Sequence, residues 1–286
     1  MTIENAPVPA PLAAAANGRV PLLEVRDLHK HYRVHASRWG GRAETLRAVD
    51  GVSLTLYRGE TLGLVGESGC GKSSLANALL MLDPPTSGQV VFAGQDLTRM
   101  NAREMRRTRR RLQVVFQDPY SSLNNRMTVG QIVGEPLVVH RIGATATERR
   151  DRVAQVLDSV GLSARDARRY PHEFSGGQRQ RIGIARALVT RPEVVVCDEP
   201  VSALDVSVQA QVLNLLQDLQ EEYELSYLFI SHDLSLVAQL VDRVAVMYRG
   251  TIVEQGDVRA VFTEPAHEYT RKLLAAVPGR RSRDRP

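Results

Sequence analysis

The residues with the most chemical content span positions 66–73 and read Gly-Glu-Ser-Gly-Cys-Gly-Lys-Ser. They follow the apolar segment 61–65 and open a helical pattern over residues 73–82. Glycines let the backbone curl until several N–H groups point at one spot, and the helix that follows adds the positive end of its dipole there. A Gly-x-x-x-x-Gly-Lys-Ser run between a strand and a helix therefore predicts a phosphate-binding loop.

The charged and hydroxyl side chains of this loop have expected roles in nucleotide binding. Lys72 reaches the β and γ phosphates of a nucleotide, and Ser73 ligates Mg2+. We also expect the positive field of the loop to lower the pKa of the Cys70 thiol. The pattern alone fits kinases, GTPases, helicases and transporter ATPases alike. The residues expected to contact nucleotide here are Gly66, Glu67, Ser68, Gly69, Cys70, Gly71, Lys72, Ser73 and Ser74.

Two carboxylates follow the apolar run 194–197. Open α/β sheets bind their ligands at the carboxyl ends of such strands. Asp198 is placed to hold Mg2+ opposite Ser73, which leaves Glu199 to polarise the water that attacks the γ phosphate. Pro200 follows, so the pair could instead begin a helix, but the phosphate loop in the same chain favours the catalytic role.

A second anion-binding pattern, Ser-Gly-Gly-Gln at residues 175–178, stands at the start of a predicted helix over residues 178–190. A serine hydroxyl and glycine N–H groups at a helix N-terminus can hold an anion. A Ser-Gly-Gly cap is ordinary by itself. The pattern is informative here because the same chain already carries a phosphate loop.

Two kinds of sequence pattern predict the helices and strands that position these residues. Short strands before the loop, with a hairpin after it, predict an antiparallel β subdomain, and helical spacing across residues 127–170 predicts an inserted α-helical subdomain. Beyond residue 175 strands and helices alternate, and continuous apolar runs indicate buried parallel strands. The expected fold is α/β, a P-loop NTPase core with a mostly parallel sheet and helices on both faces. The antiparallel strands are expected at 22–25, 31–34, 52–57 and 89–92, and the later strands at 112–116, 193–197, 227–230 and 244–248.

Composition sets the limits of this organisation. The 286 residues suffice for one large domain with a subdomain, and two cysteines exclude a disulfide framework and indicate a reducing compartment. No apolar run approaches the roughly 20 residues that cross a bilayer. We expect a disordered lead at 1–20, a nucleotide-binding domain at 21–278 with its helical subdomain at about 127–175, and a basic tail at 279–286.

The positive charge of the chain permits a second interpretation. The net charge is +5, and residues 106–111 hold five arginines, which could bind nucleic acid. Aromatic residues make up only 5% of the chain and do not interleave with this run, so a base-stacking platform is not indicated. We interpret the run as a solvated helix face.

With these motifs in order, residues 22–278 resemble the nucleotide-binding subunits of ABC transporters, in which the run at residues 174–181 is the signature motif. The resemblance implies that Gln117 is the glutamine of the loop that follows its strand, that His232 is the switch histidine, and that Tyr32 stacks on adenine. It also implies that Asp205 lies in the loop that crosses a dimer interface. Two such subunits would sandwich ATP head to tail, each facing the other's signature.

The resemblance then assigns roles to the site residues and cofactors. Glu199, His232 and Lys72 are expected to be catalytic, and ATP and Mg2+ are the expected cofactors. The residues implied to contact nucleotide beyond the loop are Tyr32, Gln117, Ser175, Gly176, Gly177, Gln178 and Asp205, and those implied to hold the metal are Ser73, Gln117 and Asp198.

Finer resemblance, in residues 116–124, 170–175, 198–205 and 267–271, is to the dipeptide and oligopeptide importer branch. It implies an ATPase on the cytoplasmic face of the inner membrane that works with two multi-span permease subunits, a second ATPase subunit and an extracytoplasmic peptide-binding protein. The second ATPase subunit could be the same chain or a sister chain. Nickel or glutathione import stays open as an alternative, and a soluble ABC ATPase acting on nucleic acid or ribosomes is the rival from another class.

Overall fold

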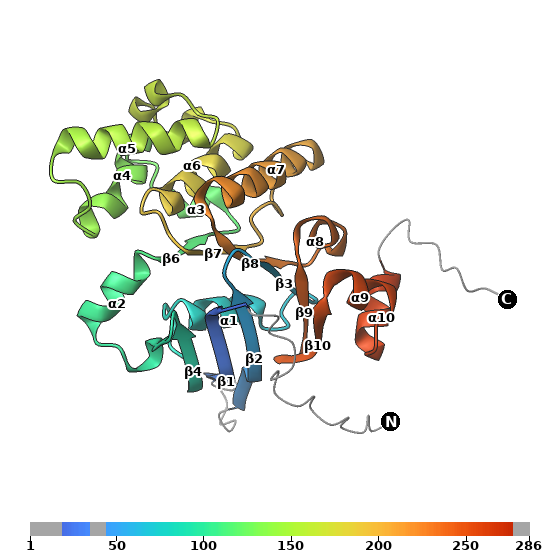
Figure 1. The fold of residues 1–286 in the computed structure, drawn as a ribbon. Coiled ribbons are helices and arrows are strands. Elements are labelled where there is room, and N and C mark those ends of the chain that lie inside the picture. Colours follow the sequence, from blue (N-terminus) through green and yellow to red (C-terminus); the bar gives the residue numbers. More distant parts are fainter. Residues whose placement is uncertain (1–18, 35–43, 277–286) are drawn as a thin grey trace, which may run out of the picture.

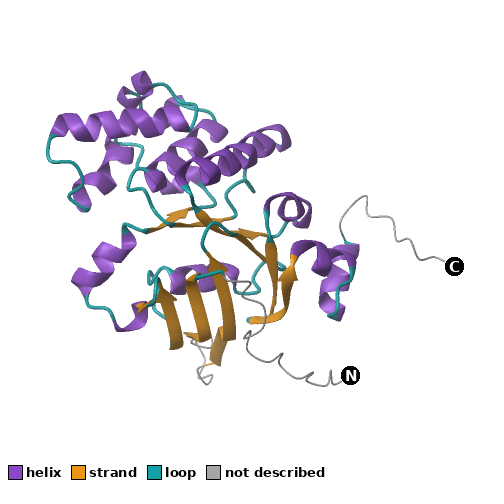
Figure 2. Cartoon of the chain, in the orientation of Figure 1, coloured by secondary structure: helices purple, strands orange, loops and turns teal. Residues whose placement is uncertain are grey.

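Two β-sheets and a set of helices build the protein, whose computed structural model describes residues 19–34 and 44–276 (Figures 1 and 2). Most of the expected N-terminal lead and the whole basic tail at 279–286 lie outside the described residues. Among the described residues, none of the helices combines the length and apolarity that a membrane crossing requires.

The first sheet is antiparallel, as predicted, and has the strand order β2-β1-β4-β5. The prediction of separate short strands at 22–25 and 31–34 is wrong, because one 14-residue strand covers both. Register shifts against its neighbours interrupt the apolar alternation of that strand, and Asp27 at φ 45° lies within the irregular stretch. The strands are β1 (Pro21–Val34), β2 (Glu44–Tyr57), β4 (Ser87–Phe92) and β5 (Gln95–Asp96).

The second sheet is the mostly parallel one, with the order β10-β9-β3-β8-β7-β6. Five strands run parallel, and β10 pairs antiparallel to β9 at one edge. The apolar runs that predicted buried strands are buried, as in β3 and β8, where each residue is covered. The strands are β3 (Thr61–Val65), β6 (Leu112–Val115), β7 (Val194–Asp198), β8 (Ser226–Ser231), β9 (Arg243–Tyr248) and β10 (Thr251–Asp257).

Helices cover both faces of the parallel sheet, as predicted (Figure 1). Alternate residues of β3 feed two different cores: Leu64 packs with α1 and the antiparallel sheet, whereas Val65 packs with α6, α7 and α8. The covering helices are α1 (Lys72–Leu79), α6 (Gly176–Leu188), α7 (Val206–Tyr223), α8 (Leu234–Leu240), α9 (Val258–Thr263) and α10 (Glu268–Ala275).

The inserted segment between β6 and α6 is helical, as predicted. It holds α3 (Pro119–Ser122), α4 (Val129–Val139) and α5 (Ala146–Ser159), followed by two short 3-10 turns. Thr128 and Thr145 begin α4 and α5 with reciprocal capping boxes, which satisfy backbone N–H groups at each helix start. The apolar residues of α5 that showed helical spacing are buried in one hydrophobic core with residues of α4 and α6, namely Val153, Val156 and Leu157.

The arginine run forms helix α2 (Ala102–Arg109) and the residues after it. Arg106, Arg107, Arg109 and Arg110 are exposed, so the run is a solvated face, as interpreted from the sequence. Asn101 caps the helix, with Glu104 completing the box.

Candidate nucleotide site

The loop between β3 and α1 is shaped by glycines that no other residue could replace without movement. Gly71 caps α1 with φ 113°, and a Cβ placed there would lie 2.0 Å from the carbonyl oxygen of Ala48. A Cβ on Gly66 would lie 2.2 Å from the carbonyl oxygen of Met247. The loop therefore follows the backbone of β2 and β9 more closely than a side chain permits.

The ammonium group of Lys72 is bonded within the loop. Its Nζ donates to the carbonyl oxygens of Gly66, at 2.8 Å, and of Glu67, at 2.9 Å, and the side chain is buried. The loop also has a support that sequence reasoning missed: the hydroxyl of Tyr269, from α10, accepts a hydrogen bond of 3.0 Å from the backbone N–H of Glu67. Only the tertiary fold brings α10 to the loop, so no local signal could have identified Tyr269.

The expected activation of Cys70 is wrong in sign. Burial raises the pKa of its thiol, and the nearby Lys72 ammonium opposes this rise only in part. Cys70 is 9% exposed and packs with the core on the α1 side of the sheet. The loop does carry positive charge, but desolvation outweighs it at this sulfur.

A cavity of about 480 Å³ opens beside the loop. It brings Tyr32 together with the loop, as the resemblance implied, and it also includes residues from β2 and the β9–β10 turn that sequence reasoning missed. The Tyr32 hydroxyl donates to Asp83 Oδ2 at 2.7 Å, which fixes the ring at the cavity wall. The lining residues are Tyr32, Leu46, Arg47, Ala48, Ser68, Gly69, Cys70, Gly71, Lys72, Ser73, Ser74, Gln117, Glu199, Arg249 and Gly250.

The carboxylate of Glu199 has a partner at each oxygen. Gln117 Nε2 donates to Oε2 at 2.9 Å, and His232 Nδ1 lies 3.1 Å from Oε1. Three separate segments, after β6, β7 and β8, thus meet at one side chain. Glu199 adopts a left-handed backbone with φ 46°, held by the hydrogen bond from its N–H to the carbonyl of Ile230.

Oxygen atoms that suit Mg2+ gather next to this carboxylate. Ser73 Oγ lies 3.4 Å from Asp198 Oδ1, as the opposed loop and strand end predict. Burial raises the pKa of Asp198, the hydrogen bond from Ser73 lowers it, and the charge of Glu199 raises it further. The amide nitrogen of Gln117 donates to Glu199, so its carbonyl oxygen is the atom left to ligate. A hydroxyl, a carboxylate and an amide oxygen form a donor set that fits a hard cation.

The signature residues lie elsewhere. Ser175 caps α6 by accepting from the N–H of Gln178 at 3.4 Å, and Gly176 and Gly177 form the first turn. A Cβ on Gly177 would lie 2.4 Å from Val208 Cγ1, so this turn packs directly against the start of α7. Asp205 occupies the N-cap position of α7, without a side-chain capping hydrogen bond. None of these five residues lines the cavity beside the phosphate loop.

Comparisons with known proteins indicate one family. The profile of the ABC transporter family matches residues 49–202. The chain is 50% identical over 263 residues to the oligopeptide transport ATP-binding protein AppF of Bacillus subtilis, covering 92% of this chain and 80% of AppF. It is 52% identical over 267 residues to OppF, the oligopeptide transport ATP-binding protein of Escherichia coli, covering 93% and 80%.

Solved structures share the fold. The ATP-binding cassette MJ0796, dimeric and bound to ADP and Pi in a post-hydrolysis state, aligns with a TM-score of 0.73 at 29% identity, covering 83% of this chain and 99% of that one. The protein cbiO1 of Clostridium perfringens, part of the ABC transporter complex cbiONQ, aligns with a TM-score of 0.73 at 28% identity, covering 90% and 96%. The motifs, the fold and these similarities together show that the chain belongs to the ABC transporter family, as an ATP-binding subunit that hydrolyses ATP.

Proposed function

We propose that this ATPase energises the uptake of short peptides through an ABC importer. The observation that carries the proposal is the identity of 50% and 52% to two oligopeptide transport ATP-binding proteins, each over more than nine tenths of the chain. In such a complex the chain would bind the cytoplasmic face of the inner membrane, next to two multi-span permease subunits. The exposed helical segment between Gln117 and Ser175 is the surface we expect them to contact.

The residues of the cavity support a hydrolysis mechanism based on positioning. Glu199 would orient the attacking water, and the contacts from Gln117 and His232 hold its carboxylate in one direction. Lys72 would neutralise charge on the β and γ phosphates, and Tyr32 would stack on the adenine. Mg2+, held by Ser73, Asp198 and Gln117, would supply further charge neutralisation at the phosphates.

A second ATPase subunit would complete the site. Ser175, Gly176, Gly177, Gln178 and Asp205 do not line the cavity, although the family resemblance implies that they contact nucleotide. In a head-to-tail dimer they would face the phosphate loop of the partner, and the similar cassette MJ0796 is a dimer. The partner could be a second copy of this chain or a sister chain.

Reconstitution of the whole complex tests the peptide assignment. The chain is co-expressed with its two candidate permease subunits, placed in liposomes, and assayed for ATP hydrolysis with a peptide-loaded binding protein. We expect stimulation by a binding protein loaded with a di- to pentapeptide, and none by the empty protein. Stimulation by a nickel- or glutathione-loaded binding protein alone would overturn peptide uptake while leaving the ATPase intact.

A matched pair of variants ties any stimulation to this chain. Glu199→Gln removes the catalytic carboxylate, whereas Glu222→Gln makes the same change of charge at an exposed position of α7. Stimulation should be lost in the first variant and kept in the second. ATP hydrolysis that responds only to ribosomes or RNA would contradict the importer altogether.

A further inference from the structure

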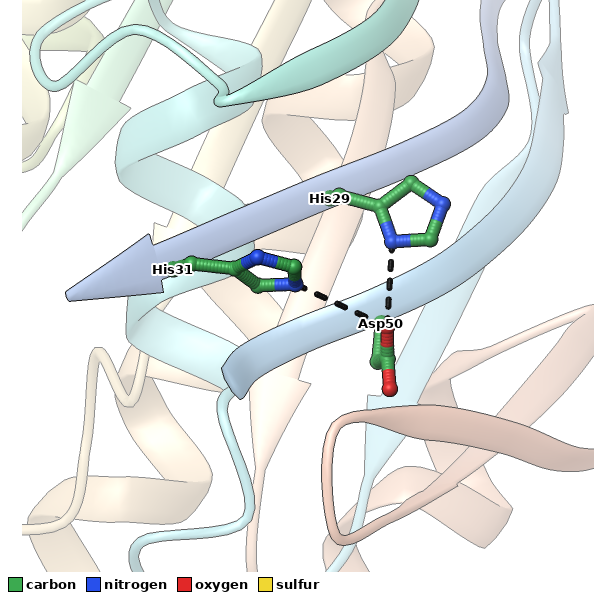
Figure 3. A group of neighbouring side chains, drawn as sticks. All are labelled: His29, His31 and Asp50. Carbon is green, nitrogen blue, oxygen red and sulfur yellow. Dashed lines mark hydrogen bonds and ion pairs between the residues drawn. The ribbon is translucent and has the colours of Figure 1, made fainter. Parts of the chain in front are cut away.

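Two histidines and an aspartate cluster on the antiparallel sheet, outside the lining of the nucleotide cavity (Figure 3). His29 and His31 lie two residues apart on β1 and project toward Asp50 on the neighbouring strand β2. Asp50 Oδ1 is 3.0 Å from His29 Nδ1 and 3.6 Å from His31 Nε2. One ligand atom from each residue lies within 4.8 Å of the other two.

These separations suit a single metal ion. A tetrahedral ion with ligands about 2.0–2.1 Å away holds pairs of ligand atoms about 3.4 Å apart. The two distances to Asp50 lie on either side of that value. The side chains are 25%, 27% and 30% exposed for His29, His31 and Asp50, so water can reach the remaining coordination positions.

The contacts of His29 fit a bound cation. Its Nε2 lies 3.2 Å from Asp27 Oδ1 while its Nδ1 lies 3.0 Å from Asp50 Oδ1. A neutral imidazole has one N–H, so it can donate to only one of these two carboxylates. An imidazolium would donate to both carboxylates. With a neutral ring, an ion between Nδ1 and Asp50 leaves Nε2–H to donate to Asp27, and His29 Nδ1 and Asp50 Oδ1 then both face the ion.

His31 supplies an independent observation. Its Nε2 is buried and, among the described residues, has no hydrogen-bond partner. A buried nitrogen without a partner is destabilising, and ligation to a metal would satisfy it. The orphaned atom faces the same oxygen, Asp50 Oδ1, that His29 contacts.

The surroundings orient the ligands as the outer shell of a metal site does. The Asp27 carboxylate holds His29 from behind, in the carboxylate–histidine–metal arrangement that fixes the tautomer. The backbone N–H of Asp50 donates to the carbonyl of Gly250 at 2.8 Å, which anchors the third ligand. Arg47 contacts the other oxygen, Asp50 Oδ2, at 3.3 Å, so it does not occupy the Oδ1 atom that faces the two histidines. The exposed guanidinium of Arg47 is screened by water.

We propose that His29, His31 and Asp50 bind one divalent transition-metal ion of the zinc class. Two imidazoles and one carboxylate favour such an ion over Mg2+ or Ca2+, which take oxygen ligands. The ion would cross-link β1 to β2 beside Tyr32 and Ala48, which line the nucleotide cavity. The site is separate from the Mg2+ ligands proposed above and does not depend on the transported substrate.

Calorimetric titration of metal-stripped, nucleotide-free full-length protein with ZnCl2 tests this site. We expect one zinc ion per chain, and affinity at least about tenfold weaker in His29→Ala, in His31→Gln and in Asp50→Asn. Asp27→Asn should weaken binding by about tenfold, because Asn keeps the left-handed backbone while losing the charged acceptor. Co2+ substitution should give visible absorption bands that His31→Gln abolishes.

Two controls separate this site from other zinc ligands in the chain. His172→Ala removes an exposed histidine far along the sequence, and Glu199→Gln disrupts the pair with His232. Zinc affinity should be unchanged in both, and circular dichroism should show that every variant is folded. An absence of zinc binding by the wild-type protein, wild-type zinc affinity in His31→Gln, or loss of zinc binding in Glu199→Gln would overturn the proposal.

Discussion

At the residue scale, the two contacts of the Glu199 carboxylate support its proposed role of orienting the attacking water. A partner on each oxygen restricts its rotation, so a water held by this carboxylate would have a defined direction. The strand order brings Gln117, Glu199 and His232 together because they follow β6, β7 and β8, which are adjacent in the sheet.

Glu199→Gln should still bind ATP but hydrolyse it at least about a hundredfold more slowly, because the amide keeps the fold and the metal ligands while losing the anionic acceptor. Steady-state phosphate release and a fluorescent-nucleotide titration measure the two properties separately. The variant should also accumulate as an ATP-bound dimer in size-exclusion chromatography. Wild-type turnover by this variant would remove Glu199 from the catalytic role.

The two thiols provide a second prediction at this scale. Cys70 should react with a thiol reagent before Cys197, because Cys70 is 9% exposed and Cys197 is fully covered within β7. Mg-ATP should protect Cys70, which lines the cavity. The single variants Cys70→Ala and Cys197→Ala assign each signal in the mass spectrum, and equal labelling with and without Mg-ATP would contradict the placement of Cys70.

The pH dependence of that labelling follows from the raised pKa of Cys70. The thiolate is the reactive form, and burial keeps the thiol protonated to higher pH than usual. The labelling rate should therefore keep rising as the pH passes 9, the ordinary value for a thiol, instead of levelling off below it. A plateau near neutral pH would show that the positive loop, and not burial, controls this sulfur.

At the scale of elements, the phosphate loop depends on a backbone path that touches two neighbouring strands. Gly71→Ala should lower the free energy of unfolding by at least about 2 kcal/mol, from left-handed strain and steric overlap with the Ala48 carbonyl. It should also abolish measurable ATP binding, since any relief of the overlap displaces the loop. Urea unfolding and nucleotide titration measure the two effects.

Gly183→Ala is the matched control for that substitution. Gly183 lies within α6, and an added Cβ there meets no atom within 4 Å. Alanine should stabilise the helix by roughly 0.5–1 kcal/mol and leave ATP binding unchanged. If Gly71→Ala unfolded at the same urea concentration as Gly183→Ala, the close approach of the loop to β2 would be wrong.

The elements also show where sequence reasoning works and where it fails. The parallel strands were predictable because burial on both faces leaves continuous apolar runs, as in residues 194–197. The course of β1 was not, because bulges break the alternation on which strand prediction depends. His29 and His31 both project toward Asp50, but the position of Asp50 beside them depends on the register of β2, which the sequence does not give.

At the scale of the whole molecule, positive charge does not by itself indicate nucleic acid. Arg109 donates to the carbonyl of Met81 at 3.0 Å and Arg111 pairs with Glu193, so part of the arginine run binds within the protein. Binding of labelled RNA or DNA should therefore be weaker than micromolar at physiological salt. Fluorescence anisotropy across a salt series measures it, and Arg107→Ala combined with Arg110→Ala should change little.

A specific set of results would contradict the expectation of weak nucleic-acid binding. Submicromolar RNA binding that weakens steeply with salt, is lost in the double arginine variant and stimulates ATP hydrolysis would restore the rival function. Stimulation only by the assembled importer complex would agree with peptide uptake.

The candidate site was predictable to the extent that its motifs are local. The loop 66–73 and the pair Asp198 and Glu199 are contiguous in sequence, and their chemistry follows from residue type and spacing. The support from Tyr269 and the raised pKa of Cys70 both arise from contacts between segments far apart in the chain. Such contacts depend on the packed fold, so composition and spacing carry no sign of them.

The left-handed backbone of Glu199 sets two selective pressures against each other at one position. A residue other than glycine costs roughly 1 kcal/mol there, within a total stability of about 5–15 kcal/mol for a typical domain. Drift toward stability favours glycine or asparagine, whereas the proposed role of residue 199 in hydrolysis requires the carboxylate. In a descendant that binds nucleotide without hydrolysing it, selection would no longer retain the carboxylate. The residue at position 199 would then indicate whether that descendant still hydrolyses ATP.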